Sequence, residues 1–208
     1  MSDSVVLIFT KSPEPGQVKT RLIPVLGEQG AARLYTALLQ REVDWIAQQT
    51  PYAMELWATP DTDHPVLREL SEQHGLSVFT QQGSDLGERM GHAAKDALSR
   101  FKQVVLLGVD CPALTPWHLQ RAFDWLAAGS DAVLGPADDG GYVLLGLRRW
   151  HPELFQGHAW GSAEVAESTR QALRRIGWRW QELPLLWDLD RPEDLAKYEA
   201  LDLDASAR

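Results

Sequence analysis

The sequence predicts an α/β fold of three layers, in which a mostly parallel central sheet is covered by helices on both faces. Short apolar runs alternate with longer segments of helical period along the 208 residues. The run VVLLGV at residues 104–109 has no polar alternation, which is typical of a strand covered on both faces. Polar residues gather where such runs end. Strand–helix alternation at this spacing predicts parallel strands joined by crossover helices.

The first half of the chain predicts three strands, each followed by a helix. The strands are expected at residues 5–9, 54–59 and 76–81, and the helices at residues 27–49, 64–75 and 86–101. Leu34 and Leu38 share one face of the first helix. Gly75 is placed to end the second helix. Asp85 and Glu88 have the spacing of a capping box at the start of the third.

The second half predicts a further run of strands and helices. Strands are expected at residues 104–109, 131–136 and 141–147, the last two joined by the loop ADDGG. Thr115 and Pro116 form an N-cap followed by a first-turn proline, which opens a helix ending near Leu126. A helix over 163–176, an extended segment over 178–188 and a helix over 190–201 follow. With no internal repeat or linker, residues 1–208 are predicted to form one domain with frayed last residues.

Composition and charge restrict the classes of partner. The net charge of −9 and pI of about 5.1 disfavour nucleic acid and anionic lipid as partners. No apolar run approaches the roughly 20 residues of a membrane span, and the start MSDSVVLIFT lacks the basic region of a signal peptide. Cys111 is the only cysteine, which excludes an intrachain disulfide. We therefore expect a cytoplasmic protein with small-molecule partners; the oligomeric state stays open.

Two acidic clusters follow apolar runs. Asp110 comes directly after the most apolar predicted strand, at the sheet edge where ligands bind in open parallel folds. A half-desolvated carboxylate there suits Mg²⁺ or Mn²⁺; alternatively, Asp110 caps the turn that leads to Thr115. Asp188 or Asp190 could supply a second carboxylate. Asp190 is also placed to cap the last helix with Glu193, so Asp188 is the preferred ligand.

A basic loop, TKSPEPGQVKTRL, follows the first strand. It brings Lys11, Lys19 and Arg21 together in an otherwise acidic chain, and cations at this position are well placed to hold a polyphosphate. The alternative is that each is a solvated surface residue. The sequence contains no P-loop, no G-x-G-x-x-G after the first strand and no G-x-S-x-G, which disfavours the corresponding nucleotide-binding and hydrolase classes.

These motifs together resemble the GT-A superfamily, the nucleotide-diphospho-sugar transferases. Lys11 with KTRL is similar to the first loop of 2-phospholactate guanylyltransferase-like proteins. GVDCPAL resembles the metal-binding segment of that group and of molybdenum-cofactor nucleotidyltransferases, and DLDRPEDL is similar to a late segment of theirs. GSDLGERM and ADDGGYVLLGL resemble an uncharacterised, glycosyltransferase-like bacterial branch. The resemblance covers nearly the whole chain.

The resemblance implies a single-domain GT-A (Rossmann-like) three-layer sandwich with three groups of site residues. The implied metal ligands are Asp110 and Asp188, holding Mg²⁺ or Mn²⁺. The implied nucleotide-binding residues are Lys11, Gly16, Lys19, Arg21, Gln82, Gly83, Leu86, Gly87, Arg89 and Asp110. The implied acceptor-binding residues are Asp138, Asp139, Gly140, Gly141, Tyr142, Trp160 and Ser162. Lys11, Lys19 and Arg21 would stabilise the leaving phosphates, and Asp139 is the candidate general base.

The resulting hypothesis is a metal-dependent transferase that uses a nucleoside triphosphate or a nucleotide sugar. Asp110-Cys111-Pro112 lacks the second carboxylate of a glycosyltransferase D-x-D motif, which favours nucleotidyl transfer to a small acceptor. Glycosyl transfer from a nucleotide sugar is the alternative reaction. A non-catalytic nucleotide- or metabolite-binding protein on the same fold is the alternative of another class.

Overall fold

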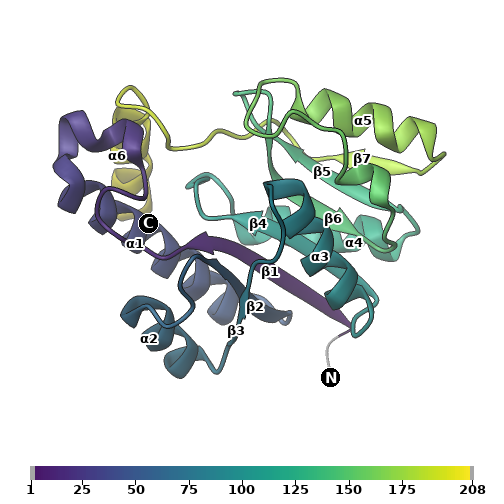
Figure 1. Cartoon of the computed structure of the whole chain (residues 1–208), viewed down its shortest axis with the longest axis horizontal. Coiled ribbons are helices and arrows are strands. Elements are labelled where there is room, and N and C mark those ends of the chain that lie inside the picture. Colours follow the sequence, from purple (N-terminus) through teal and green to yellow (C-terminus); the bar gives the residue numbers. More distant parts are fainter. Residues whose placement is uncertain (1–2, 207–208) are drawn as a thin grey trace.

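A seven-stranded sheet forms the centre of the fold in the computed structural model, which describes residues 3–206 (Figure 1). The strands are β1 (Ser4–Lys11), β2 (Ala53–Thr59), β3 (Ser77–Thr80), β4 (Gln103–Gly108), β5 (Ala132–Pro136), β6 (Tyr142–Leu147) and β7 (Trp180–Glu182). Their order across the sheet is β3-β2-β1-β4-β6-β5-β7. Among these strands only β6 runs against its neighbours, β4 and β5; the other strand pairs are parallel. The predicted mostly parallel sheet is confirmed.

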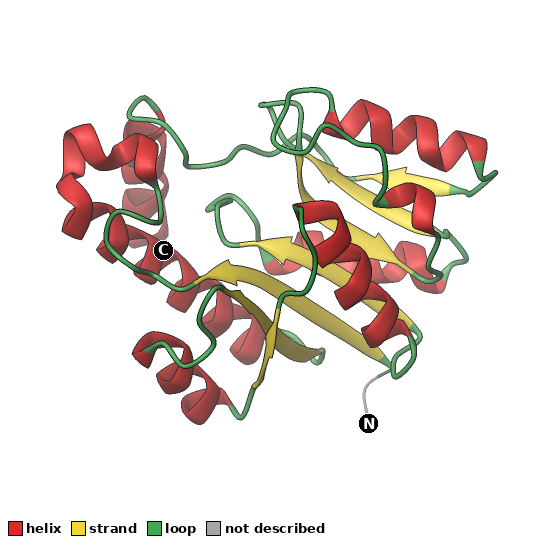
Figure 2. Cartoon of the chain, viewed as in Figure 1, coloured by secondary structure: helices red, strands yellow, loops and turns green. Residues whose placement is uncertain are grey.

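Helices cover both faces of this sheet (Figure 2). They are α1 (Ile23–Gln49), α2 (Pro65–His74), α3 (Leu86–Leu98), α4 (Pro116–Ala127), α5 (Val165–Arg175) and α6 (Asp194–Ser206), with 3₁₀ turns η1 (Thr20–Leu22) and η2 (Pro152–Leu154). Val6 and Ile8 of β1 pack in the core formed with α1, α2 and α4. Val5 and Leu7 pack in the core formed with α3 and α5. The alternation of these four fully buried side chains explains why the strand reads as one continuous apolar run.

The six predicted helices are all present, but four of their ends differ by three residues or more. α3 ends at Leu98 and not at Phe101, α6 ends at Ser206 and not at Leu201, and the starts of α1 and α6 also differ. α1 begins at Ile23, before the predicted start at residue 27. Gly27 has non-helical backbone angles (φ 68°, ψ 166°) and forms a kink between a short first helical piece and the rest of α1. The last helix begins at Asp194 and not at Asp190. The carboxylate of Asp194 accepts the backbone N–H groups of Asp190 and Arg191, so the predicted capping role of Asp190 is wrong.

A segment that we call the C-terminal strap, residues 183–193, connects β7 to α6. Figure 1 shows it in yellow, crossing from the β7 side of the molecule to the side of α1. Backbone hydrogen bonds hold it to the sheet edge: Leu186 N–H donates to Pro136 O at 2.9 Å, and Leu189 N–H donates to Asp110 O at 2.8 Å. These bonds place the late acidic residues at the end of β4.

The end of the chain, DLDASAR at residues 202–208, is expected to fray. Residues 202–206 instead belong to α6, and residues 207 and 208 lie outside the described residues. Within residues 3–206, no helix is both long and apolar enough to cross a membrane.

Candidate functional site

A cleft of about 620 Å³ opens at the carboxyl ends of β1 and β4. It is bounded by the loop after β1, the start of α3, the β5–β6 loop, the turn before α5 and the strap. The predicted site residues that line it are Lys11, Lys19, Arg21, Leu86, Arg89, Asp110, Asp139, Gly141, Tyr142, Trp160, Ser162 and Asp188. Those that do not line it are Gly16, Gln82, Gly83, Gly87, Asp138 and Gly140. Residues from both ends of the sequence therefore meet in one cavity.

The acidic end of the cleft is formed by Asp110 and Asp188. Asp188 is largely buried, and its Oδ1 has no hydrogen-bond partner among the described residues. Burial and the nearby charges of Asp110 and Asp139 raise the pKa of Asp188 to about 7. A buried carboxylate oxygen without a donor, beside a second carboxylate, is an arrangement that a cation would stabilise.

The carboxylates of Asp110 and Asp188 fit a hard cation that keeps several water molecules in its coordination shell. In the described part of the chain, no group of three or more His, Cys, Asp or Glu side chains gathers closely enough to hold a metal ion. Mg²⁺ commonly takes one or two protein carboxylates and completes its shell with water and substrate phosphate. Asp110 and Asp188 match that pattern, and the set does not resemble a closed structural metal site.

Lys19 is not a free phosphate ligand in this structure. Its side chain is 3% exposed, and its ammonium lies 2.5 Å from Oδ1 of Asp110. The same ammonium donates to the carbonyl oxygen of Leu189 at 2.5 Å. Lys19 is also the one non-glycine residue with positive φ in residues 3–206, at 48°, a conformation that side chains rarely adopt. Lys19 thus links the first loop to the strap across the end of β4.

The other two predicted cations differ from each other. Arg21 pairs with Asp190 on the strap, and both side chains are substantially exposed. Lys11 is exposed at the end of β1 and forms no ion pair with a described residue. Of the three cations in the loop, Lys11 is the one positioned to meet an incoming phosphate without first breaking an ion pair.

Tyr35 and Gln81 are among the polar side chains that line the cleft and were not predicted. The hydroxyl of Tyr35 accepts the backbone N–H of Lys11 at 2.9 Å and hydrogen-bonds with the hydroxyl of Thr10 at 3.0 Å. The amide of Gln81, not Gln82, faces the cleft and donates to the carbonyls of Thr10 and Trp57. Tyr35 could have been predicted from its place on the buried face of the helix that follows the cationic loop. Nothing in the sequence distinguishes Gln81 from Gln82.

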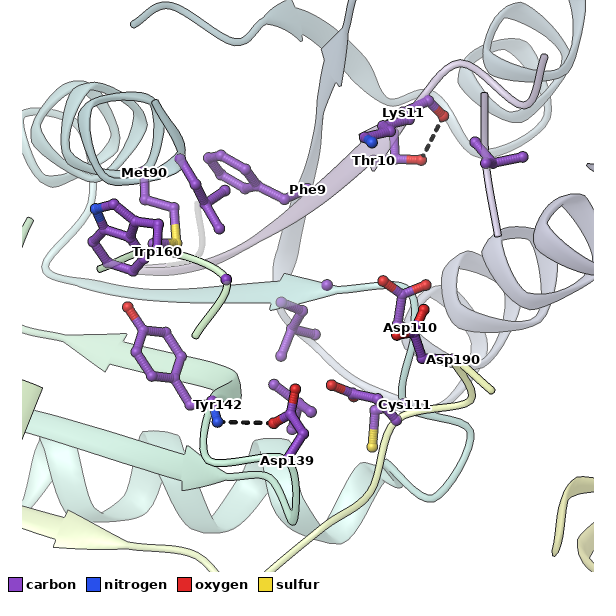
Figure 3. Close-up of a pocket in the computed structure, with 18 of the residues that line it drawn as sticks. Phe9, Thr10, Lys11, Met90, Asp110, Cys111, Asp139, Tyr142, Trp160 and Asp190 are labelled. Atoms are coloured by element: carbon purple, nitrogen blue, oxygen red, sulfur yellow. Dashed lines mark hydrogen bonds between the residues drawn. The ribbon is translucent and has the colours of Figure 1, made fainter. Parts of the chain in front are cut away.

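Aromatic and apolar side chains form the opposite end of the cleft. Figure 3 shows Phe9, Met90, Tyr142 and Trp160 there, away from Asp110. The rings of Tyr142 and Trp160 meet edge to face with centroids 6.4 Å apart. We call these four residues the aromatic compartment.

The start of α3 and the turn that carries Trp160 form adjoining walls of the aromatic compartment, although they were predicted to bind different ligands. The start of α3, predicted to hold the base or ribose, packs against the turn of Trp160, predicted to bind the acceptor. A Cβ at Gly87 would overlap the carbonyl oxygen of Phe155 and the indole of Trp160. The absence of a side chain at Gly87 therefore allows these two walls to pack closely, and Gly87 does not itself line the cleft.

The β5–β6 loop presents one of its two aspartates to the cleft. Asp139 lines it, and its Oδ1 accepts the N–H of Gly141 at 2.8 Å. Asp138 lies 3.8 Å from Lys197 and does not line the cleft. A Cβ at Gly140 would overlap the backbone of Ala163, so this loop and the turn before α5 are closely packed. Of the two carboxylates in this loop, Asp139 is therefore the one that faces the cleft.

A family model described as "Uncharacterized protein conserved in bacteria (DUF2064)" matches residues 42–162, which include Asp110, Asp139 and Trp160. The chain belongs to this family. No curated protein matches the DUF2064 chain.

Solved structures show the same fold. A "putative nucleotide-diphospho-sugar transferase" from Desulfovibrio desulfuricans G20 is 38% identical, with a TM-score of 0.84 over 92% of this chain and 84% of that one. A CMP:2-keto-3-deoxy-manno-octonic acid synthetase complexed with CTP is 12% identical, with a TM-score of 0.60 over 98% and 100%. Glucosyl-3-phosphoglycerate synthase from Mycobacterium tuberculosis, solved with Mn²⁺ and UDP, is 12% identical, with a TM-score of 0.54 over 95% and 75%. The predicted nucleotide-diphospho-sugar transferase fold is confirmed.

Proposed function

We propose that this DUF2064 protein is a divalent-cation-dependent transferase whose donor is a nucleoside triphosphate or a nucleotide sugar, with nucleotidyl transfer to a small acceptor as the favoured reaction. The observation that carries the proposal is the pairing of Asp110 and Asp188 at the end of β4, in the same cleft as Lys11. Structures of this fold have been solved with CTP and with UDP and Mn²⁺, which supports the choice of ligand class.

Asp110 and Asp188 would hold the cation, and Lys11 would contact the donor phosphates. When bound, Mg²⁺ or Mn²⁺ would neutralise negative charge on the phosphates on either side of the bond that breaks. The Lys11 ammonium adds a mobile point charge that follows the leaving pyrophosphate. Tyr35 keeps the backbone of Lys11 in place through its hydrogen bond to the N–H.

The acceptor would enter the aromatic compartment, with its hydroxyl directed toward Asp139. In nucleotidyl transfer, the acceptor oxygen forms a bond to the α-phosphorus while the bond from that phosphorus to the leaving pyrophosphate breaks. The hydroxyl proton passes to the Asp139 carboxylate, whose orientation is set by the N–H of Gly141. The aromatic walls exclude water, which limits hydrolysis of the donor.

Glycosyl transfer is the second candidate reaction, and one feature of the chain argues against it. The residue two positions after Asp110 is Pro112, so the second carboxylate of a D-x-D motif is missing. The two reactions differ in their product: nucleotidyl transfer releases pyrophosphate, and glycosyl transfer releases a nucleoside diphosphate.

A thermal-unfolding panel of nucleoside triphosphates and nucleotide sugars, each with and without Mn²⁺, tests the proposal. A ligand at 100 times its Kd stabilises the folded state by about 2.7 kcal/mol, a shift that is readily measured. We expect a cation-dependent shift with at least one donor, and its loss in Asp188→Asn. Absence of any shift would contradict the proposal. A shift without turnover, across a screen of hydroxyl acceptors, would favour the non-catalytic alternative.

A further inference from the structure

The ammonium of Lys19 contacts Oδ1 of Asp110, the buried one of the two carboxylate oxygens through which a cation would bind. It lies 2.5 Å from Oδ1 of Asp110 and donates to Leu189 O at 2.5 Å, in a side chain that is 3% exposed. A divalent cation and an ammonium cannot share the same carboxylate oxygen at these distances without strong repulsion, which is not screened by solvent where the lysine is buried.

We propose that Lys19 determines the form in which this site accepts its cation: it excludes free divalent cations and admits a cation that arrives together with a polyphosphate. The inference rests on the cation-dependent function proposed above and extends it, since it names the metal–polyphosphate complex as the species that binds.

The exchange follows from the contacts that Lys19 would lose and gain. Phosphate oxygens offer the ammonium new acceptors close to its present ones, since Lys11, Lys19 and Asp110 line one cleft. Lysine has a flexible four-carbon stem, so its ammonium can change partners without movement of the backbone. Once the ammonium contacts phosphate, Asp110 is released to the cation. Cation and polyphosphate therefore bind with positive coupling.

The backbone around Lys19 favours its position in the protein without ligand. Its positive φ of 48° sets the direction of the side chain, and the strap that carries Leu189 is held to Asp110 by its own backbone hydrogen bond. The neighbouring Arg21 lacks these features. It pairs with Asp190, and both side chains are substantially exposed. Arg21 is therefore a matched control: it is a cation of the same loop that pairs with a different carboxylate, Asp190 of the strap.

Binding of Mn²⁺ alone to the full-length protein, measured by calorimetry or by the loss of the free-Mn²⁺ electron paramagnetic resonance signal, tests the inference. We expect Lys19→Met and Lys19→Gln to bind Mn²⁺ at least tenfold more tightly than the wild type. Lys19→Arg, which keeps the charge, and Arg21→Gln are expected to bind it as weakly as the wild type. Adding Asp110→Asn to Lys19→Met is expected to remove the gain, which would locate the ion at Asp110.

Inorganic pyrophosphate serves as the polyphosphate probe. In the wild type we expect Mn²⁺ to increase pyrophosphate affinity at least tenfold, and in Lys19→Met the increase is expected to be smaller. Equal affinity of the wild type and both neutral variants for free Mn²⁺ would overturn the inference. That result, combined with a Mn²⁺-dependent nucleotide shift in the wild type, would leave the proposed function intact. A gain of Mn²⁺ binding in Lys19→Met without nucleotide binding by any variant would instead support the role of Lys19 and contradict the proposed donor.

Discussion

The hydroxyl of Tyr35, on α1, accepts the backbone N–H of Lys11, the last residue of β1, at 2.9 Å. Tyr35 is 5% exposed, so its hydroxyl replaces water as the partner of that N–H. The core-facing surface of α1 thus sets the path of the chain at the point where β1 enters the cleft. A largely buried helix residue in this way lines the cleft and holds its edge in place.

Tyr35→Phe is expected to destabilise the protein by roughly 1–3 kcal/mol, because it leaves the N–H of Lys11 without an acceptor. Nucleotide affinity is expected to fall several-fold as the position of Lys11 loosens. Urea unfolding and nucleotide titration measure the two effects. Tyr52→Phe is the matched control, since the Tyr52 hydroxyl donates to the exposed side chain of Gln120. Equal effects of the two substitutions would contradict the role given to Tyr35.

Lys19 and Asp110 are expected to be energetically coupled. In a double-mutant cycle of Lys19→Met, Asp110→Asn and the double variant, we expect a coupling free energy of roughly 0.5–3 kcal/mol, measured by urea unfolding. The reason is that Asp110→Asn removes the negative charge that the buried ammonium of Lys19 contacts directly. Strictly additive effects would show that the pair does not contribute to the stability of the folded protein.

Gly87→Ala is expected to destabilise the protein by roughly 1–3 kcal/mol, the usual cost of overpacking. The added methyl group would overlap the carbonyl oxygen of Phe155 and the indole of Trp160, so the wall of the aromatic compartment must shift. Gly108→Ala is the control for stability, because a Cβ at Gly108 meets no atom within 4 Å. Thermal unfolding, together with the change in tryptophan fluorescence, measures the effect. Stability equal to that of Gly108→Ala would contradict the close packing of α3 on Trp160.

Glu42, on α1, is expected to make stability fall as pH rises through the neutral range. Burial raises the pKa of Glu42 from 4.5 to about 8. Between these two values the folded protein keeps a proton that the unfolded chain has lost. The free energy of unfolding therefore decreases with increasing pH, by about 1.4 kcal/mol per pH unit at most. Glu42→Gln is expected to remove this slope, so that its stability relative to the wild type increases from pH 5 to pH 8. Denaturant unfolding at several pH values measures the difference; parallel stability curves for the two proteins would contradict the prediction.

Much of the site could be predicted from sequence, because the carboxyl ends of parallel strands meet at one edge. Lys11 follows β1 and Asp110 follows β4, and this rule alone brings them together. Residue types then indicated the chemistry: cations for phosphate and carboxylates for a hard cation. The same local patterns predicted Thr115–Pro116 and Asp85 as helix starts, which the structure confirms.

By itself the sequence determined the fold class, the order of strands and helices along the chain, and many of the side chains that line the cleft. These depend on periodicity and on local turn and capping chemistry. Only the tertiary structure decided which of them are partners. Lys19 contacts Leu189 across 170 residues of sequence, Arg21 contacts Asp190, and Gly87 lies against Trp160. Such contacts depend on loop paths and on side-chain packing between segments distant in the chain. No local pattern encodes these, so the Lys19–Asp110 pair could not be predicted although both residues could.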